Sequence, residues 1–169
     1  MRLRYIGVAT VLGLLCQEVM SAEAELEIGG TLVADPCVLT VDTEDQTVDF
    51  GVIASKTFIN HSRSVGKPFS IHLSECDLTL GNSVQLTFRG EEDSDQPGTF
   101  AIGGEVAGVA IALEDSEAQP VVPGGVSLPL TLNEGDTLLR YQAYLQAQDF
   151  SKVKEGEFIS TLIFELEYE

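Results

Sequence analysis

Tryptophan is absent from this sequence of 169 residues, and basic side chains are scarce: nine lysines and arginines stand against 27 aspartates and glutamates. A surface that binds phosphate groups needs clustered Lys and Arg. The formal net charge of −18 therefore argues against nucleic acid or an anionic membrane surface as a partner. The two histidines, His61 and His72, stand alone without ligand spacing, so the sequence also argues against zinc and predicts no metal or cofactor.

Motifs that carry catalysis are missing as well. We find no nucleophile elbow, no phosphate-binding loop and no supported pair of catalytic carboxylates. The acidic stretch EEDSDQPG, residues 91–98, offers carboxylates for calcium but lacks the rest of a known calcium loop, which favours a solvated turn. The sequence predicts that the protein is not an enzyme.

The first apolar run, Ile6–Cys16, is too short to span a membrane. Arg2 and Arg4 precede it and small residues follow it, which is the layout of a secretory signal peptide. We predict that residues 1–22 are the signal peptide, with the cleavage position left open between 21 and 24. The protein is therefore expected to be exported.

Removal of the signal leaves two cysteines, Cys37 and Cys76. An even pair in an exported chain most simply forms one disulfide. Such a bond would close a loop of about 38 residues and contribute roughly 3–4 kcal/mol to stability by the loop-entropy estimate. A metal site is the competing interpretation, and the isolated histidines argue against it.

The mature chain is predicted to be all-β, because short alternating runs rich in Val and Thr are separated by turn signals such as Asp35-Pro36 and residues 123–125. We expect a Greek-key sandwich of immunoglobulin-like kind in one domain, residues 35–169. The predicted strands are Leu26–Val33, Cys37–Val41, Thr47–Phe50, Phe69–Leu73, Ser83–Phe88, Thr99–Ile102, Val106–Leu113, Val126–Leu130, Leu138–Ala147 and Phe158–Tyr168.

The segment Phe158–Tyr168 carries the strongest alternation. One face is apolar at period two, and its residues are Phe158, Leu162, Phe164, Leu166 and Tyr168. No later strand follows in the sequence to pair with it. We therefore expect an incomplete sandwich that lacks its final strand and leaves a hydrophobic groove open beside this segment.

Residues 23–34 form a candidate arm in front of the domain. Its sequence AELEIGGTLV alternates, and the face opposite its glutamates carries Leu26, Ile28, Gly30 and Leu32. Such a strand could enter the groove of another copy, adding ladder bonds and burying alternate side chains. A disordered tail is the alternative interpretation of the arm, and an ordinary edge strand is the alternative interpretation of Phe158–Tyr168.

The mature sequence resembles the pilin subunits of the chaperone–usher pathway of Gram-negative bacteria. The resemblance is carried by the arm with Gly30, by DPCVLTV around the first cysteine, by FSIHLSEC around the second, and by VQLTFRG, AGVAIALED and LLRYQAYL in that order. Members of this family end in an alternating strand with a penultimate tyrosine and a glycine fourteen residues from the end. Tyr168 and Gly156 occupy those places.

The resemblance implies a mechanism, donor-strand exchange, and several partners. A periplasmic chaperone would place a strand beside Phe158–Tyr168 and hold the Glu169 carboxylate with basic residues. At the outer-membrane usher, the arm of the next pilus subunit would replace that strand. The implied acceptor groove contains Gly156, Phe158, Leu162, Phe164, Leu166, Tyr168 and Glu169, and the implied destination is a cell-surface fimbrium used in adhesion.

Within that family the chain looks most like a minor or adaptor subunit of a P-pilus or type 1-like pilus. A major rod subunit is the alternative, and a pilus terminator remains open. A carbohydrate-binding adhesin is disfavoured because tip adhesins carry an additional receptor domain and lack a donor arm. A secreted β-sandwich enzyme or inhibitor is disfavoured because the sequence offers no site for it.

Overall fold

The computed structural model describes residues 25–32 and 34–169 of the chain. The predicted signal peptide, residues 1–22, lies outside the described residues, as do Glu23, Ala24 and Val33. The chain divides into two units, residues 1–32 and 33–169. They are described separately below.

Residues 25–32 of the first unit carry neither helix nor strand, so the strand predicted over Leu26–Val33 is wrong as far as these residues are concerned. The apolar side chains of this arm are open to solvent, with Leu26 81 %, Ile28 86 % and Leu32 100 % exposed. A strand is stabilised by its ladder and its cross-strand neighbours. The alternation of apolar and polar residues in the arm is therefore not sufficient to form a strand.

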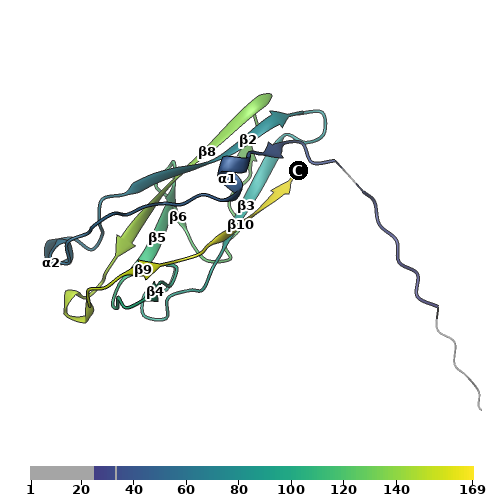
Figure 1. The fold of residues 1–169 in the computed structure, drawn as a ribbon. Coiled ribbons are helices and arrows are strands. Elements are labelled where there is room, and N and C mark those ends of the chain that lie inside the picture. The colour runs from purple at the N-terminus through teal and green to yellow at the C-terminus, as the bar shows by residue number, and fades with distance from the viewer. Residues whose placement is uncertain (1–24, 33) are drawn as a thin grey trace, which may run out of the picture. The chain divides into compact units, whose positions relative to one another are not determined.

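The second unit is an antiparallel β structure with one five-stranded sheet, one three-stranded sheet and a two-stranded pair (Figure 1). The five-stranded sheet runs in the order β1 (Val38–Leu39), β2 (Lys67–Cys76), β8 (Gly135–Gln146), β5 (Ala110–Asp115) and β6 (Pro120–Val121). The three-stranded sheet has the order β10 (Ile163–Tyr168), β3 (Ser83–Arg89) and β7 (Leu130–Thr131). The pair joins β4 (Gly103–Gly104) to β9 (Phe158–Ile159).

Three short helices interrupt the strands: α1 (Val41–Glu44), α2 (Thr57–Asn60) and the 3₁₀ turn η1 (Phe150–Lys152). Each is a single turn, so none has the length at which a helix is stable without tertiary packing. Phe58 of α2 is buried in the core, which explains why that turn is held in place.

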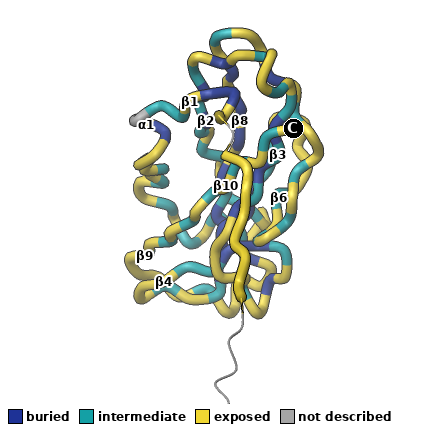
Figure 2. The backbone as a smooth tube through the Cα atoms, turned by 90° about the vertical axis from the view of Figure 1, so that its right-hand side faces the viewer, coloured by how far each residue is buried: buried dark blue, intermediate teal, exposed yellow. Residues whose placement is uncertain are grey.

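The core is built mainly from residues of β2, β8, β5 and β3. Figure 2 colours the buried residues dark blue. In β8 the inward residues Leu139, Tyr141, Ala143 and Leu145 are buried while their neighbours point outward, which is the alternation expected of a sheet with one solvated face. Phe100 sits at the centre with no exposed surface.

The predicted disulfide between Cys37 and Cys76 is present. Both cysteines are buried: Cys37 is 5 % exposed and Cys76 is 4 % exposed. The bond ties the start of β1 to the end of β2, where a bulge shifts the register between Leu73 and Cys76.

Several predicted strands have different bounds in the structure. Thr47–Phe50 and Thr99–Ile102 are not strands, although Phe100 makes isolated bridges to Glu92 and Ile111. The strand predicted over Cys37–Val41 is shortened to β1 because α1 begins at Val41, and Phe158–Tyr168 is divided into β9 and β10. Val126–Leu130 is reduced to β7 and one bridge between Val126 and Thr87. A segment with alternating apolar and polar residues becomes a β-strand only when a neighbouring strand forms ladder hydrogen bonds with it. Without such a neighbour it stays irregular.

Candidate functional site

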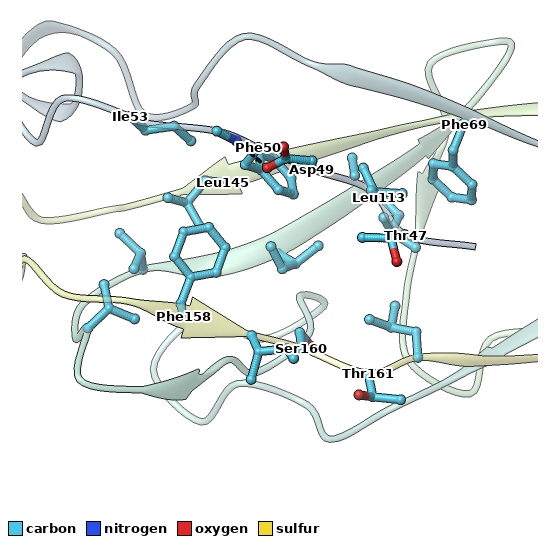
Figure 3. Close-up of a pocket in the computed structure, with 18 of the residues that line it drawn as sticks. Thr47, Asp49, Phe50, Ile53, Phe69, Leu113, Leu145, Phe158, Ser160 and Thr161 are labelled. Carbon is cyan, nitrogen blue, oxygen red and sulfur yellow. Dashed lines mark hydrogen bonds between the residues drawn. The ribbon is translucent and has the colours of Figure 1, made fainter. Parts of the chain in front are cut away.

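A large hydrophobic groove opens on the second unit, with a volume of about 1480 Å³. In Figure 3, residues 47–53 run along one side, Phe158 to Thr161 run along the other, and Leu113 and Leu145 lie between them. The groove is the place where the sequence leaves the sandwich incomplete. It is therefore the candidate functional site.

The floor of the groove is the core itself. The lining residues Phe88, Val109, Ile111, Leu113, Ala143 and Leu145 are at most 5 % exposed, because the five-stranded sheet and β3 place them inward. Phe69 adds a half-buried ring that contacts Tyr141, with 5.5 Å between ring centroids. A segment bound in the groove would therefore contact packed aliphatic and aromatic side chains.

One wall is formed by β9, the start of β10 and the residues that join them. Residues 158–164 line the groove; within them Phe158, Leu162 and Phe164 are half-buried, whereas Ile159 and Ile163 are 73 % and 64 % exposed. The predicted alternation of this segment is thus seen in the burial of its side chains.

Within residues 34–169, β10 is one of the two edge strands of its sheet, since β3 is its one ladder partner. The register continues to the last residue. The Glu169 amide donates to the Ser83 carbonyl at 3.0 Å, and the Glu169 carbonyl accepts from the Asn82 amide at 3.0 Å. The other edge of β10 therefore presents backbone donors and acceptors that a further strand could use.

The opposite wall, residues 46–53, was not predicted to belong to the site. Val48, Phe50 and Ile53 face inward and pack against the core, while Asp49 and Val52 are exposed. Its one local hydrogen bond runs from the Gly51 amide to the Asp49 carboxylate at 2.7 Å. The segment VDFGVI had the alternation of a strand, and it lacks a ladder partner among the described residues.

The two walls come together at one end of the groove. The Ser55 hydroxyl donates to the Glu155 carboxylate at 2.6 Å, and the rings of Phe50 and Phe158 lie 6.0 Å apart between centroids. Beside them, Gly156 has no room for a side chain, because a Cβ there would lie 2.8 Å from the Cβ of Glu105. Gly156 thus lets the wall pass close to residues 105–106.

The residues predicted for the acceptor groove follow one another along this wall. Gly156, Phe158, Leu162 and Phe164 line the cavity described above, Leu166 and Tyr168 continue along β10, and Glu169 follows β10. Leu166 and Tyr168 are half-buried against the core. Burial, reinforced by the negative charge of Asp35, raises the pKa of Tyr168. These residues extend the edge of the strand beyond the cavity.

The chemistry of the groove is that of a binding surface. Its interior is apolar, and charges such as Lys56, Lys154 and Glu157 lie on exposed positions around it. Across residues 25–32 and 34–169, no cluster of three or more His, Cys, Asp or Glu side chains could hold a metal ion. In the same residues, no helix is long and apolar enough to cross a membrane.

Comparisons with known proteins identify the family of the chain. The family model described as Fimbrial protein matches residues 26–169. The chain is 32% identical over 174 residues to the Fimbria A protein of Serratia marcescens, covering 100% of both chains. It is 30% identical to the Major MR/P fimbria protein of Proteus mirabilis, covering 83% of this chain and 81% of the other.

Among solved structures, the crystal structure of the P pilus rod subunit PapA superposes with a TM-score of 0.72 at 25% identity, covering 80% of this chain and 100% of that one. The similarity extends to the incomplete immunoglobulin-like sandwich. The relatives are structural fimbrial subunits and not enzymes, as the sequence predicted. The chain therefore belongs to the fimbrial protein family and is a pilus subunit of the chaperone–usher type.

Proposed function

We propose that this subunit polymerises by donor-strand exchange, with the arm of one copy lying in the groove of the next. The observation that carries the proposal is a pair of unpaired backbone edges, residues 46–53 and β10, on the two sides of an apolar groove of about 1480 Å³. A single inserted strand could form ladder bonds with both edges. Its alternate side chains would then point onto the groove floor.

The arm has the composition of such a strand. Leu26, Ile28 and Leu32 share one face and are almost fully exposed. At about 1.5–3 kcal/mol for each buried side chain, their burial would contribute roughly 5–9 kcal/mol as an upper figure, before the cost of ordering the arm. That is enough to hold subunits together.

The position at which the chain enters the second unit supports exchange between copies. A Cβ on Gly81 would lie 2.8 Å from the Pro36 ring and 3.1 Å from the Glu169 carbonyl oxygen, so Pro36 lies beside the carboxyl end of β10. An arm fixed at that end could enter its own groove only parallel to β10. The arm of another copy is free to run antiparallel, which is the more stable pairing.

Before assembly, the same groove requires protection. An open apolar groove flanked by unpaired edges is an aggregation hazard. We propose that a periplasmic chaperone supplies a strand beside Phe158–Tyr168 and binds the Glu169 carboxylate through basic residues. Release would take place at the outer-membrane usher, where the next arm replaces the chaperone strand.

For the place in the pilus, we propose the major rod instead of the minor or adaptor position favoured by the sequence patterns. The support comes from the similar proteins, because the Proteus mirabilis relative is named a major fimbria protein and the PapA structure is a rod subunit. Immunogold labelling of purified fimbriae distinguishes the two roles. Label along the whole shaft is expected, and label confined to the tip would favour the adaptor.

The groove proposal is tested by adding a second copy of residues 24–32 after Glu169 through a short flexible linker. The groove should then be filled within one molecule, giving a soluble monomer that melts at least about 10 °C higher than the mature chain without the addition. A matched control carries Ile28→Asp in the added copy, which places a charge on the apolar floor. Equal melting temperatures for the filled chain and the control would sink the proposal.

The added copy also tests the role of Gly30. In the arm, a Cβ on Gly30 would meet no atom within 4 Å, so the subunit's own fold does not require a glycine there. We expect the groove to require it, because two backbones approach closely where an inward position lacks a side chain. Gly30→Leu in the added copy should lose most of the gain in melting temperature. Retention of the full gain would show that the groove is deep at that point.

A further inference from the structure

Acidic side chains gather on the solvent side of both edges that flank the groove. On β10, Glu165 and Glu167 are exposed and alternate with residues that pack against the core, and Glu169 follows at the end of the chain. Across the groove, Asp49 is exposed on the opposite wall, and the exposed Asp45 comes just before that wall. The groove is therefore apolar on its floor and acidic along both rims.

The arm carries acidic residues on its own polar face. Glu25 and Glu27 are exposed and alternate with the apolar residues Leu26 and Ile28. When the apolar face lies on the groove floor, as the proposed function requires, alternation turns the two glutamates outward. They then stand on the same side of the sheet as the acidic residues of the rims.

The pairing between the arm and the β10 wall is limited to a few registers. An antiparallel arm with its apolar face inward places even-numbered residues opposite even-numbered residues of this wall. Three such registers pair all of residues 25–32 with residues 158–169. In these registers Glu25 lies opposite position 165, 167 or 169, and each of these positions is a glutamate. Glu167 is therefore directly opposite Glu25 or diagonal to it in every case.

Little positive charge lies on this face of the sheet to neutralise the pair. The Arg89 guanidinium on β3 forms an ion pair with the Glu165 carboxylate, with 2.7 Å between Nε and Oε1. Gln85 of β3 lies opposite Glu167. In the part of the chain that the structure describes, no ion pair involves Glu167. The cation on β3 is thus already paired with a different glutamate.

The remaining positive charges near the arm do not change this balance. Lys56 and Lys154 line the groove at the end where its two walls meet. Glu25 would lie at the other end, near the carboxyl end of β10. Signal cleavage, expected between positions 21 and 24, would leave one α-amino group close to Glu25. The negative charges of the arm and the rims still outnumber the positive ones.

We propose that this like-charge contact makes the joint between two subunits sensitive to acid and to salt, so that the joint is stronger in acid than at neutral pH. The inference rests on the proposed function, because the carboxylates meet only when the arm of one copy lies in the groove of the next. Like charges opposite each other on paired strands are destabilising. The repulsion is absent when one carboxyl group is protonated, and it returns as the pH rises above about 4.3, the ordinary value for glutamate. Salt screens it.

The test follows the release of subunits from purified fimbriae assembled from the full-length protein. The fimbriae are incubated in urea at low ionic strength, at about pH 7 and at about pH 4, and the released subunit is measured over time. Glu25→Gln removes one charge and keeps the shape of the side chain. At neutral pH its release should be about threefold slower than that of the parent protein. The difference should close in acid, and added salt at neutral pH should reduce it.

The matched control is Glu117→Gln, because Glu117 is exposed on the turn between β5 and β6 and lies outside the groove. This variant loses the same charge and should follow the parent protein at both pH values. Equal release of Glu25→Gln and the parent at neutral pH would overturn the inference. A slower release in Glu117→Gln as well would also overturn it, because total charge would then be the cause.

Charge reversal on the acceptor side tests the direction of the effect. Glu167→Lys replaces repulsion by attraction at neutral pH, so its joint should weaken in acid as Glu25 of the neighbouring copy takes up a proton. The parent joint should strengthen over the same range. The parent's direction of pH dependence in Glu167→Lys would contradict the inference. If Glu167→Lys does not assemble, Glu25→Gln decides alone, since Glu25 lies in the exposed arm.

A separate measurement on the parent fimbriae distinguishes this inference from the proposed function. Arm exchange predicts a detergent-resistant ladder of linked subunits. A ladder together with equal release rates refutes the acid-sensitive joint alone. Absence of the ladder refutes arm exchange and this inference with it.

Discussion

The central strand of the three-stranded sheet, β3, is flanked differently on its two sides. On one side of β3, the chain covers the edge itself with β7 and the segment around Ser127, fixed by hydrogen bonds at Gly124 and Ser127. On the other side β10 is added, and nothing in residues 34–169 pairs with its outer edge. An unprotected edge is normally avoided in soluble proteins. Both β7 and β10 are edge strands of this sheet, but β7 has two residues, whereas β10 has six and lies beside an apolar groove.

The difference also appears in burial. Leu86 on β3 is 1 % exposed and lies under both neighbours, whereas Leu162 on the groove wall is only half-buried. Removing a buried leucine costs the transfer of its atoms and the cavity left behind. Truncating Leu162 on the open wall should cost much less free energy of unfolding, as long as no strand covers it.

The largest expected effect on the free energy of unfolding comes from truncating these two leucines. Leu86→Ala should lower the free energy of unfolding by about 3 kcal/mol in the subunit with an empty groove, and Leu162→Ala by no more than about 1 kcal/mol. Urea unfolding of the mature chain measures both. In the version filled by an added arm, the cost of Leu162→Ala should rise toward that of Leu86→Ala, while the cost of Leu86→Ala stays the same. Equal costs in the empty subunit would mean that the wall is already closed.

The sequence predicted the groove unevenly, and the reason is physical. Phe158, Leu162 and Phe164 could be assigned to it because alternation fixes which side chains share a face. Leu166 and Tyr168 share that face and pack against the core further along β10, and their part in an acceptor groove stays a prediction. The alternation of apolar and polar residues along one strand does not show how far that strand lies from another segment of the chain.

The opposite wall shows the reverse case. Val48 and Phe50 were read as part of a strand, and the face that they share does point inward. The ladder is missing because its partner is not supplied by residues 34–169. The general architecture and the disulfide were predictable from turn signals and cysteine count. The pairing of two glycines in β4 with β9 was not, since neither residue carries a side chain that marks a strand.

Titration offers a second, smaller contrast between the closed and open sides. Burial, reinforced by the negative charge of Asp115, raises the pKa of Tyr141 to about 12. Tyr141 packs between Phe69 and Phe88, with ring centroids 5.5 and 5.1 Å away. Because the pKa of Tyr141 is higher in the folded state than in the unfolded state, the folded protein holds the phenol proton more tightly. The contribution of this group to the free energy of unfolding is therefore fully present below pH 10 and is lost as the pH rises toward 12.

Over that window the free energy of unfolding should fall with a slope that approaches about 1.4 kcal/mol per pH unit. Tyr141→Phe should flatten this slope. Tyr168→Phe on the open strand should flatten it less, because Tyr168 is only half-buried. Ultraviolet absorbance of the phenolate and urea unfolding at each pH give the two measurements. An identical slope in the parent and in Tyr141→Phe would show that another group controls the alkaline transition.

The smallest effect compares one hydroxyl on each side. Ser127→Ala removes the acceptor of the Leu86 amide, and that amide belongs to a residue with almost no exposed surface. A buried donor left without its partner costs about 1 kcal/mol. Thr161→Ala on the open wall removes an exposed hydroxyl and should change the free energy of unfolding by less than about 0.5 kcal/mol. Hydrogen exchange adds a local reading: the Leu86 amide should exchange faster in Ser127→Ala and at the parent rate in Thr161→Ala. If Thr161→Ala were instead the more destabilising of the two, the open edge would have to be held by contacts as firm as those that close the opposite one.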